Sequence, residues 1–128
     1  LFTAAIGAPS AQAASEQSRL IGQVMGLLEK SFGDAFDADS VNAARFAVHL
    51  RYFLVRARTA VQIEDGTSSL VAEALRVSDP DAYRVARRIR DLLEIRLNTA
   101  VTDDETAYLA LHVARLTSSL QQATQSDA

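Results

Sequence analysis

Cysteine is absent from the 128-residue chain, so disulfides and thiolate metal sites are excluded. This absence fits a reducing cytoplasm, which is the location we expect. An excess of positive charge is also missing, because the formal net charge is −3. A segment without a basic field is a poor candidate for direct contact with nucleic acid. Long apolar runs are missing as well, so no membrane-spanning segment is predicted.

The sequence also lacks the usual signatures of enzymes and metal sites. It has no glycine-rich phosphate loop, so no nucleotide site is indicated. Its two histidines come without cysteine and without His-Glu-x-x-His spacing, which makes a zinc site a weak hypothesis. Acidic residues such as Asp79, Asp81 and Asp103 stand where helices begin, and capping explains them better than acid–base chemistry does. We therefore predict no cofactor, no metal and no catalytic residue.

What is present is the composition of one ordinary globular domain, with 48% hydrophobic and 23% charged residues. Residues 1–15 are rich in small residues and are interrupted by Gly7 and Pro9, with no basic segment before them. We interpret them as a linker or leading tail. Residues 122–128 are polar and predict a frayed C-terminal tail. The folded domain is then expected over residues 16–121.

Apolar residues recur at helical spacing along this domain. The pattern predicts five helices, at about residues 20–32, 40–63, 69–77, 80–97 and 102–120. Gly33 is placed to end the first helix, and Pro80 suits the first position of the fourth. Thr102 and Glu105 match a capping box, in which hydroxyl and carboxylate each accept a hydrogen bond from a backbone N–H at the helix start.

Each predicted helix carries an apolar stripe that would face a common core. The stripe of the second helix comprises Phe46, Leu50, Phe53, Leu54, Ala57 and Val61, and that of the third comprises Leu70, Val71, Ala74 and Leu75. No segment shows sustained strand alternation, and the connections between helices are short. The expected fold is an all-α, compact five-helix bundle.

The two histidines lie at the edges of these stripes. At about 100° per residue, His49 lies roughly 90° and His112 roughly 70° from the centre of its own stripe. Both positions are anchored on one side and accessible on the other. A nucleophile that must meet a partner protein needs such a position.

Arginines accompany both histidines at helical-neighbour spacing. Arg45 comes four residues before His49, and Arg56 comes seven residues after it. Arg115 comes three residues after His112. Guanidinium groups there would neutralise a phosphate and orient it by bidentate hydrogen bonds. Position alone still favours, by roughly three to one, an ordinary amphipathic histidine, and arginines along a helix usually form a solvated face.

The segments around both histidines resemble motifs of a known family, the PTS regulation domain. Residues 45–56, Arg-Phe-Ala-Val-His-Leu-Arg-Tyr-Phe-Leu-Val-Arg, are similar to its first motif, a His-Leu-x-x-Phe helix with a following arginine. Residues 102–115, Thr-Asp-Asp-Glu-Thr-Ala-Tyr-Leu-Ala-Leu-His-Val-Ala-Arg, are similar to its second motif, an acidic helix start followed by Tyr-Leu-x-Leu-His. Between them, residues 69–73 and 79–86 resemble the connecting helix and the Pro-x-Ala-Tyr helix start of the family.

The resemblance implies a five-helix bundle that forms homodimers. Such domains occur, usually as a tandem pair, in transcriptional antiterminators of the BglG/LicT kind and in some activators. Their histidines are phosphorylated by the phosphocarrier HPr or by enzyme II components of the sugar phosphotransferase system. In antiterminators this controls dimerisation of a separate RNA-binding domain, so any contact with RNA would pass through a domain absent from this chain.

Residue roles follow from the same resemblance. His49 and His112 match the two phosphate acceptors, and Arg56 matches the motif arginine. Arg45 and Arg115 come from helical geometry alone. Two loops depart from the family pattern: Ser-Ser-Leu stands at 68–70 where Asn-Pro-Leu is common, and asparagine stands at 98 where glycine is common. Asparagine can also take a left-handed conformation, so the expected fold is unchanged.

Three functions compete at this point. The leading one is a signalling domain regulated by phosphorylation, followed by a plain dimerisation module that has lost its phosphorylation. The third is a small all-α enzyme that uses His49 or His112 as general base, and no carboxylate on an adjacent helical turn orients either ring for that role. If the second and fifth helices are neighbours, the two histidines should lie close together beside the dimer surface. Arg56 should then matter more for the response to phosphate than for folding.

Overall fold

The computed structural model describes residues 11–59, 62, 64, 66 and 68–127, with side chains as far as residue 117. The elements within them are five α-helices and one short 3-10 helix, and no strand occurs in this part of the chain. In order they are α1 (Ala11–Phe32), η2 (Gly33–Ala35), α2 (Val41–Arg58), α3 (Ser68–Ser78), α4 (Pro80–Leu97) and α5 (Asp103–Asp127). The predicted all-α five-helix bundle is confirmed.

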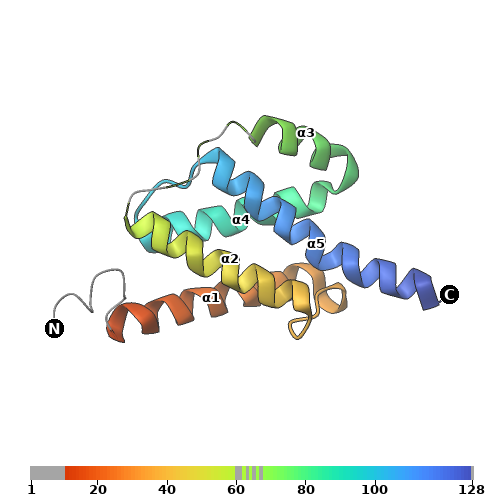
Figure 1. The fold of residues 1–128 in the computed structure, drawn as a ribbon, viewed down its shortest axis with the longest axis horizontal. Coiled ribbons are helices and arrows are strands. Elements are labelled where there is room, and N and C mark those ends of the chain that lie inside the picture. Colours follow the sequence, from red (N-terminus) through yellow and green to blue (C-terminus); the bar gives the residue numbers. More distant parts are fainter. Residues whose placement is uncertain (1–10, 60–61, 63, 65, 67, 128) are drawn as a thin grey trace.

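Helix α5 occupies the middle of the bundle (Figure 1). It packs against α4, α3 and α2, while α1 packs against α4 and α2. Helices α2 and α5 run in opposite directions (Figure 1). Successive turns of α2 therefore face successively earlier turns of α5, which decides which of their side chains meet.

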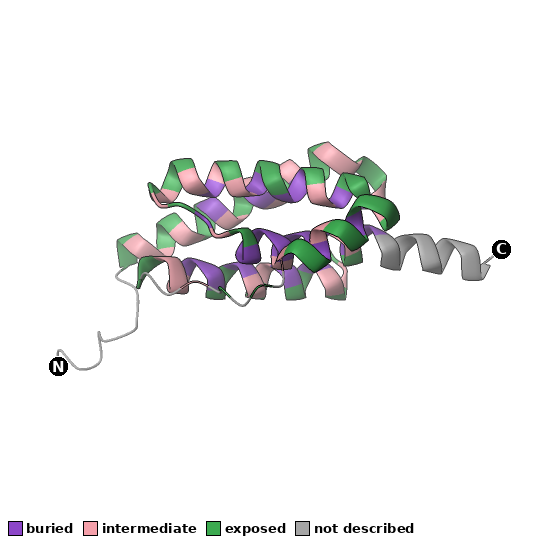
Figure 2. Ribbon diagram, turned by 90° about the horizontal axis from the view of Figure 1, so that it is seen from above, coloured by how far each residue is buried: buried purple, intermediate pink, exposed green. Residues whose placement is uncertain are grey.

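The core is a cluster of apolar side chains enclosed by the helices, purple in Figure 2. Its largest fully buried apolar members are Phe46, Phe53, Leu28, Leu50, Ile89, Leu93, Leu109, Val24 and Val113. Burying one such side chain contributes about 1.5–3 kcal/mol relative to leaving it exposed. The apolar stripes of α2 and α5 therefore determine the faces on which these helices meet.

Side-chain caps begin α2, α4 and α5. Each cap accepts a hydrogen bond from the backbone N–H three residues further on, at 3.1 Å for Ser40, 3.2 Å for Asp79 and 3.1 Å for Thr102. Such a cap stabilises a helix by about 1 kcal/mol. Pro80 is the first residue of α4, as predicted, and Asn98 ends that helix with a left-handed backbone at φ 51°.

Helix α2 ends earlier than predicted, at Arg58 rather than near residue 63. The Thr59 hydroxyl and backbone N–H bind carbonyls of the last turn and close the helix. Gln62 lies beyond the helix and connects the chain to the start of α5. Its Nε2 donates to the Ala100 carbonyl at 2.7 Å, and its Oε1 accepts the Thr102 N–H at 2.9 Å. Val61, predicted as part of the α2 stripe, lies outside the described residues.

Three further expectations differ from the structure. Helix α1 begins at Ala11, so residues 11–15, predicted as part of a leading tail, are helical, and residues 1–10 lie outside the described part. Helix α5 continues to Asp127 through most of the predicted C-terminal tail. In α3, Leu70 and Ala74 are exposed although they were predicted to face inward. This short helix packs mainly against α4 and α5, and its buried residues Val71 and Leu75 face that contact.

Candidate functional site

Two side-chain pairs join α2 and α5 along the seam where these antiparallel helices meet. His49 of α2 lies against His112 of α5, and Arg56 of α2 binds Glu105 of α5. The second pair is seven residues from the first, forward on α2 and backward on α5. Seven residues are two helical turns, so the two pairs lie about 10 Å apart along the seam.

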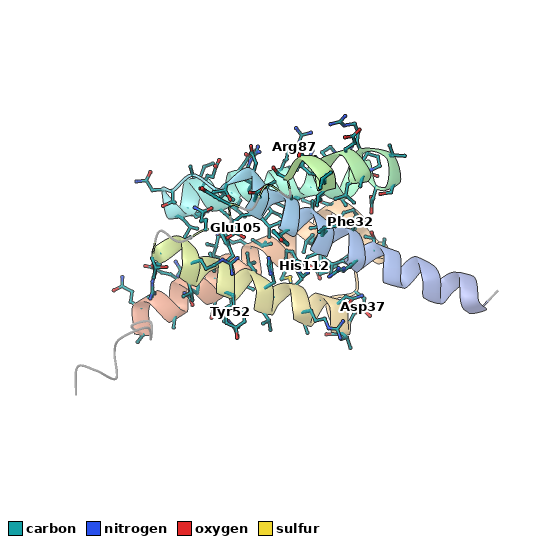
Figure 3. The ribbon with its side chains drawn as sticks, turned by 45° about the horizontal axis from the view of Figure 1, so that its top comes forward. Phe32, Asp37, Tyr52, Arg87, Glu105 and His112 are labelled. Atoms are coloured by element: carbon teal, nitrogen blue, oxygen red, sulfur yellow. The ribbon has the colours of Figure 1, made fainter. Side chains whose placement is uncertain are left out.

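The histidine pair is a close ring contact. The centroids of the two imidazoles are 4.2 Å apart, and the ring planes meet at 33°. Phe46 lies edge-on to His112, with ring centroids 6.5 Å apart. Figure 3 shows His112 on the side of α5 that faces α2. The expectation that the two boundary histidines lie close together is confirmed.

Burial lowers the pKa of both histidines. At His112, burial is the largest cause, and the positive charges of His49 and Arg115 help to bring its pKa down to about 4. At His49, burial lowers the pKa first and the Arg56 guanidinium adds to the effect. Two rings this close cannot both be cationic without repulsion. At neutral pH both rings are therefore neutral, and each keeps a lone pair on one nitrogen.

One ring nitrogen of the histidine pair makes no hydrogen bond in the described part of the chain. His49 Nε2 is buried and has no hydrogen-bond partner within the described residues. A buried polar atom without a partner costs about 1–3 kcal/mol, so folded proteins retain few of them. The unpartnered Nε2 of His49 is therefore not explained by packing alone.

The second pair is a bidentate ion bridge. Arg56 Nε donates to Glu105 Oε2 at 3.1 Å, and its Nη2 donates to Oε1 at 2.9 Å. The side chain of Glu105 is 0% exposed and that of Arg56 is 26% exposed. Removing one partner from a buried pair costs about 3–5 kcal/mol, because the other charge loses its counter-ion. Arg56 thus contributes to the fold more than its boundary position suggested.

Glu105 was predicted to accept a hydrogen bond from a backbone N–H at the start of its own helix. The threonine half of the predicted capping box forms, since Thr102 Oγ1 accepts the Glu105 N–H. Both oxygens of the Glu105 carboxylate, however, accept hydrogen bonds from Arg56. A signal for this pairing exists in the spacing. Arg56 stands seven residues after His49, and Glu105 stands seven residues before His112.

The neighbouring Asp104 ties the start of α5 to the start of α3. Its Oδ2 accepts the Gly66 N–H at 2.9 Å, and its Oδ1 accepts the Ser68 N–H at 2.8 Å. Asp104 is buried. The first turn of α5 therefore holds two adjacent carboxylates, one directed to α2 and the other to the N-terminus of α3.

The remaining predicted arginines are exposed. Arg115 lies close enough to His112 for its charge to lower the pKa of that ring, and its carbonyl accepts a hydrogen bond from Asn42 Nδ2 at 3.4 Å. Arg45 and His49 both line a shallow depression on the outer face of α2. The structure thus brings Arg56 and Arg115 within electrostatic range of the rings and leaves Arg45 at the rim.

The outer face of α2 exposes large apolar side chains. Val41 is 68% exposed, Val48 47% and Tyr52 63%, and all three line the depression that His49 also lines. Figure 3 shows Tyr52 on the side of α2 turned away from α5. His49 therefore lies between the exposed apolar surface of α2 and the seam where α2 meets α5.

The described residues form neither a metal-ligand cluster nor a membrane-spanning helix. No group of three or more His, Cys, Asp or Glu side chains in them is placed to hold a metal ion. None of the helices in the described part of the chain is long and apolar enough to cross a membrane.

Comparison with known proteins identifies the domain. The family model of the PRD domain matches residues 22–116. The chain belongs to the PRD family. The match to this PRD includes both pairs of the seam, from His49 and Arg56 on α2 to Glu105 and His112 on α5.

Three curated relatives of this PRD are named as antiterminators. The beta-glucoside operon antiterminator of Dickeya chrysanthemi is 25% identical over 109 residues, which cover 84% of this chain and 38% of that protein. The PtsGHI operon antiterminator of Bacillus subtilis (strain 168) is 26% identical over 106 residues, covering 83% and 37%. Transcription antiterminator LicT of the same strain is 22% identical over 99 residues, covering 77% and 35%. The chain therefore spans less than half the length of these relatives.

Proposed function

We propose that this PRD is a phosphohistidine-regulated signalling domain of a transcriptional antiterminator or activator. HPr or an enzyme II component of the sugar phosphotransferase system would phosphorylate His49 or His112. The phosphorylation state would then control dimerisation and the activity of the parent protein. The observation that supports this proposal is the histidine pair itself, two half-buried imidazoles in contact from different helices with arginine charge beside each.

The proposed transfer needs no nucleotide. The lone pair of a neutral histidine nitrogen attacks the phosphorus of a donor phosphohistidine. The P–N bond of the donor breaks as the new P–N bond forms. The donor imidazole leaves with the bonding electrons and takes up a proton, and the acceptor ring releases the proton of its other nitrogen. The lowered pKa of His49 and His112 keeps such a lone pair available at neutral pH. Guanidinium groups would balance the added charge.

The proposed assembly is a homodimer, and we assign its contact to the outer face of α2. Val41, Val48 and Tyr52 expose apolar surface there, and Arg45 stands at its edge. His49 lines the same depression. A phosphoryl group of about −1.5 to −2 charge next to this surface would change how two copies pack, which couples phosphorylation to assembly.

The names of the relatives support the remaining parts of the proposed function. They are named as antiterminators, so we infer a regulatory domain without enzymatic activity of its own. RNA would be contacted only through a separate domain of the parent protein. Exchange with HPr or enzyme II would take place in the cytoplasm.

The experiment is phosphohistidine detection after incubation of the purified chain with phosphorylated HPr or with phosphorylated enzyme II. Wild-type protein should become labelled, and the His49→Gln/His112→Gln double variant should not. The two single variants report which ring accepts phosphate from which donor. A folded wild-type protein that takes no label from any donor would overturn the proposal and favour a plain dimerisation module.

A further inference from the structure

We propose that Glu105 is the residue that a phosphoryl group displaces from Arg56. In the unmodified domain Glu105 holds the Arg56 guanidinium, and phosphorylation of His49 or His112 draws that guanidinium away. This inference rests on the proposed function and names how the phosphate is read inside the fold. Glu105 acts through Arg56, so it is a positioning residue rather than a catalytic one.

Arg56 lies within range of both Glu105 and a phosphoryl group on the histidine pair. The two pairs of the seam are about 10 Å apart, and a helical side chain leans toward the N-terminus of its own helix. For Arg56 that direction leads along α2 toward His49. The Arg56 charge already contributes to the lowered pKa of His49. A phosphoryl group on either ring would shorten the remaining gap.

A phosphoryl group is the stronger competitor for the guanidinium. It carries a charge of about −1.5 to −2 and three acceptor oxygens. Glu105 offers one carboxylate, and both of its oxygens accept hydrogen bonds from Arg56. Guanidinium binds carboxylate and phosphate in the same two-pronged manner, so the exchange keeps its geometry. With 26% of its side chain exposed, Arg56 is also less confined than Glu105.

The exchange has a consequence at the start of α5. The fully buried Glu105 carboxylate loses the guanidinium that binds both of its oxygens, which is unfavourable for a buried charge. The preceding residue, Asp104, accepts the backbone N–H groups of Gly66 and Ser68. A rearrangement of this turn would therefore reach the N-terminus of α3. The phosphate signal would spread from the α2–α5 seam to a third helix.

The test uses the Glu105→Gln variant, which keeps the size of the side chain and removes its charge. Glu73→Gln is the matched control, because Glu73 is exposed on α3 and its replacement changes the net charge equally. The distribution of phosphate between HPr and the full chain is measured at equilibrium by phosphorus NMR. Glu105→Gln should shift it toward the phosphorylated chain by tenfold or more, since no buried carboxylate then competes for Arg56 or is left without it. Glu73→Gln should shift it less than twofold.

Two further readouts separate partner exchange from a merely structural role. The Arg56 Nε–H resonance should move when wild-type protein is phosphorylated and should already be displaced in unmodified Glu105→Gln protein. In the same unmodified variant the pKa of His49 should fall below its wild-type value, because the Arg56 charge is no longer offset by Glu105. Arg56→Lys keeps a charge without the two-pronged geometry and should weaken the phosphorylated state.

The outcomes are distinguishable. Wild-type protein that accepts phosphate, with Glu105→Gln behaving like Glu73→Gln in the equilibrium measurement, overturns the partner exchange and leaves the proposed function standing. Wild-type protein that accepts no phosphate overturns the proposed function. In that case an unchanged His49 pKa and an unchanged Arg56 resonance in Glu105→Gln protein would also refute the positioning role of Glu105.

Discussion

The Arg56 guanidinium binds both oxygens of the buried Glu105 carboxylate, two helical turns along the seam that also holds His49 against His112. One contact surface between α2 and α5 thus contains an ion pair and a pair of neutral rings. The ion pair stabilises the seam, and the buried Nε2 of His49 has no hydrogen-bond partner among the described residues. Stability and the proposed regulation consequently share the same few residues.

The ion pair should make Arg56 important for stability. Arg56→Ala leaves the fully buried Glu105 carboxylate without its guanidinium and should cost about 3 kcal/mol in the free energy of unfolding. Glu105→Gln should cost less, about 1–2 kcal/mol, because the partly exposed Arg56 can turn toward water. The double variant Arg56→Met/Glu105→Leu should recover most of the loss. Urea denaturation measures all three, and equal stability of Arg56→Ala and wild type would contradict this role.

Stability should also depend on pH through the histidines. Because the pKa of His112 is lowered to about 4 in the folded chain, the unfolded chain binds the proton more tightly. The stabilising contribution is therefore complete above about pH 6.5 and is lost as the pH falls from there toward about 4. The lowered pKa of His49 acts in the same direction.

Between about pH 7.5 and pH 5 we expect a loss of roughly 1–2 kcal/mol in the free energy of unfolding. The His112→Gln variant should show a flatter pH dependence over this range. Proton NMR of the ring C–H groups gives the folded-state pKa values directly. An ordinary histidine titration of His112, near pH 6.5, would contradict the burial and charge effects described here.

Asp104 should stabilise the connection between α5 and α3. Asp104→Ala removes the acceptor for the Gly66 and Ser68 N–H groups and should cost about 1–3 kcal/mol. Hydrogen exchange at these two amides should accelerate more than exchange in α1. Exchange rates at Gly66 and Ser68 that match wild type would show that the two hydrogen bonds do not form in solution.

The outer face of α2 should carry the proposed dimer contact. Tyr52→Glu places a charge on a side chain that is 63% exposed, so it should weaken self-association by tenfold or more with little effect on folding. The control is Ile95→Glu on α4, where the side chain is 77% exposed and lies on a different helix. Sedimentation equilibrium measures both. Equal association constants for the two variants would remove α2 from the interface.

The sequence predicted the five helices and their order and, if α2 and α5 are neighbours, the histidine pair. Apolar periodicity marks the stripes of α2 and α5, and Pro80 and Thr102 mark the helix starts. Once α2 and α5 are neighbours, two histidines at the edges of their stripes are brought to one seam. The stripes and helix starts depend on neighbouring residues, and the histidine pair follows from burial of the stripes. Sequence patterns can therefore predict them.

Other features depend on register and on distant partners. Glu105 satisfies a local capping pattern, and only the antiparallel register of α2 and α5 directs its carboxylate to Arg56. Helix α2 ends at Arg58 although helical periodicity continues beyond it, and Gln62 binds the segment before α5. Leu70 is 74% exposed because α3 uses only a narrow stripe for packing. Apolar periodicity alone therefore does not predict the partner of Glu105, the end of α2 or the exposure of Leu70.

The two rings should compete for phosphate. With ring centroids 4.2 Å apart, two phosphoryl groups of about −1.5 to −2 charge each would repel strongly unless cations intervene. We therefore expect one phosphate per chain under conditions in which each single variant, His49→Gln or His112→Gln, still accepts one. A chain that carries two phosphates as readily as one would contradict the shared site.

The most direct test of the central claim is the mass of the intact chain after incubation with phosphorylated HPr or enzyme II, measured at neutral pH. We expect one added phosphoryl group that is lost in acid, as a phosphohistidine is, and no addition to the His49→Gln/His112→Gln variant. An unchanged mass for the folded wild-type chain, or an acid-stable phosphate that persists in the double variant, would contradict it.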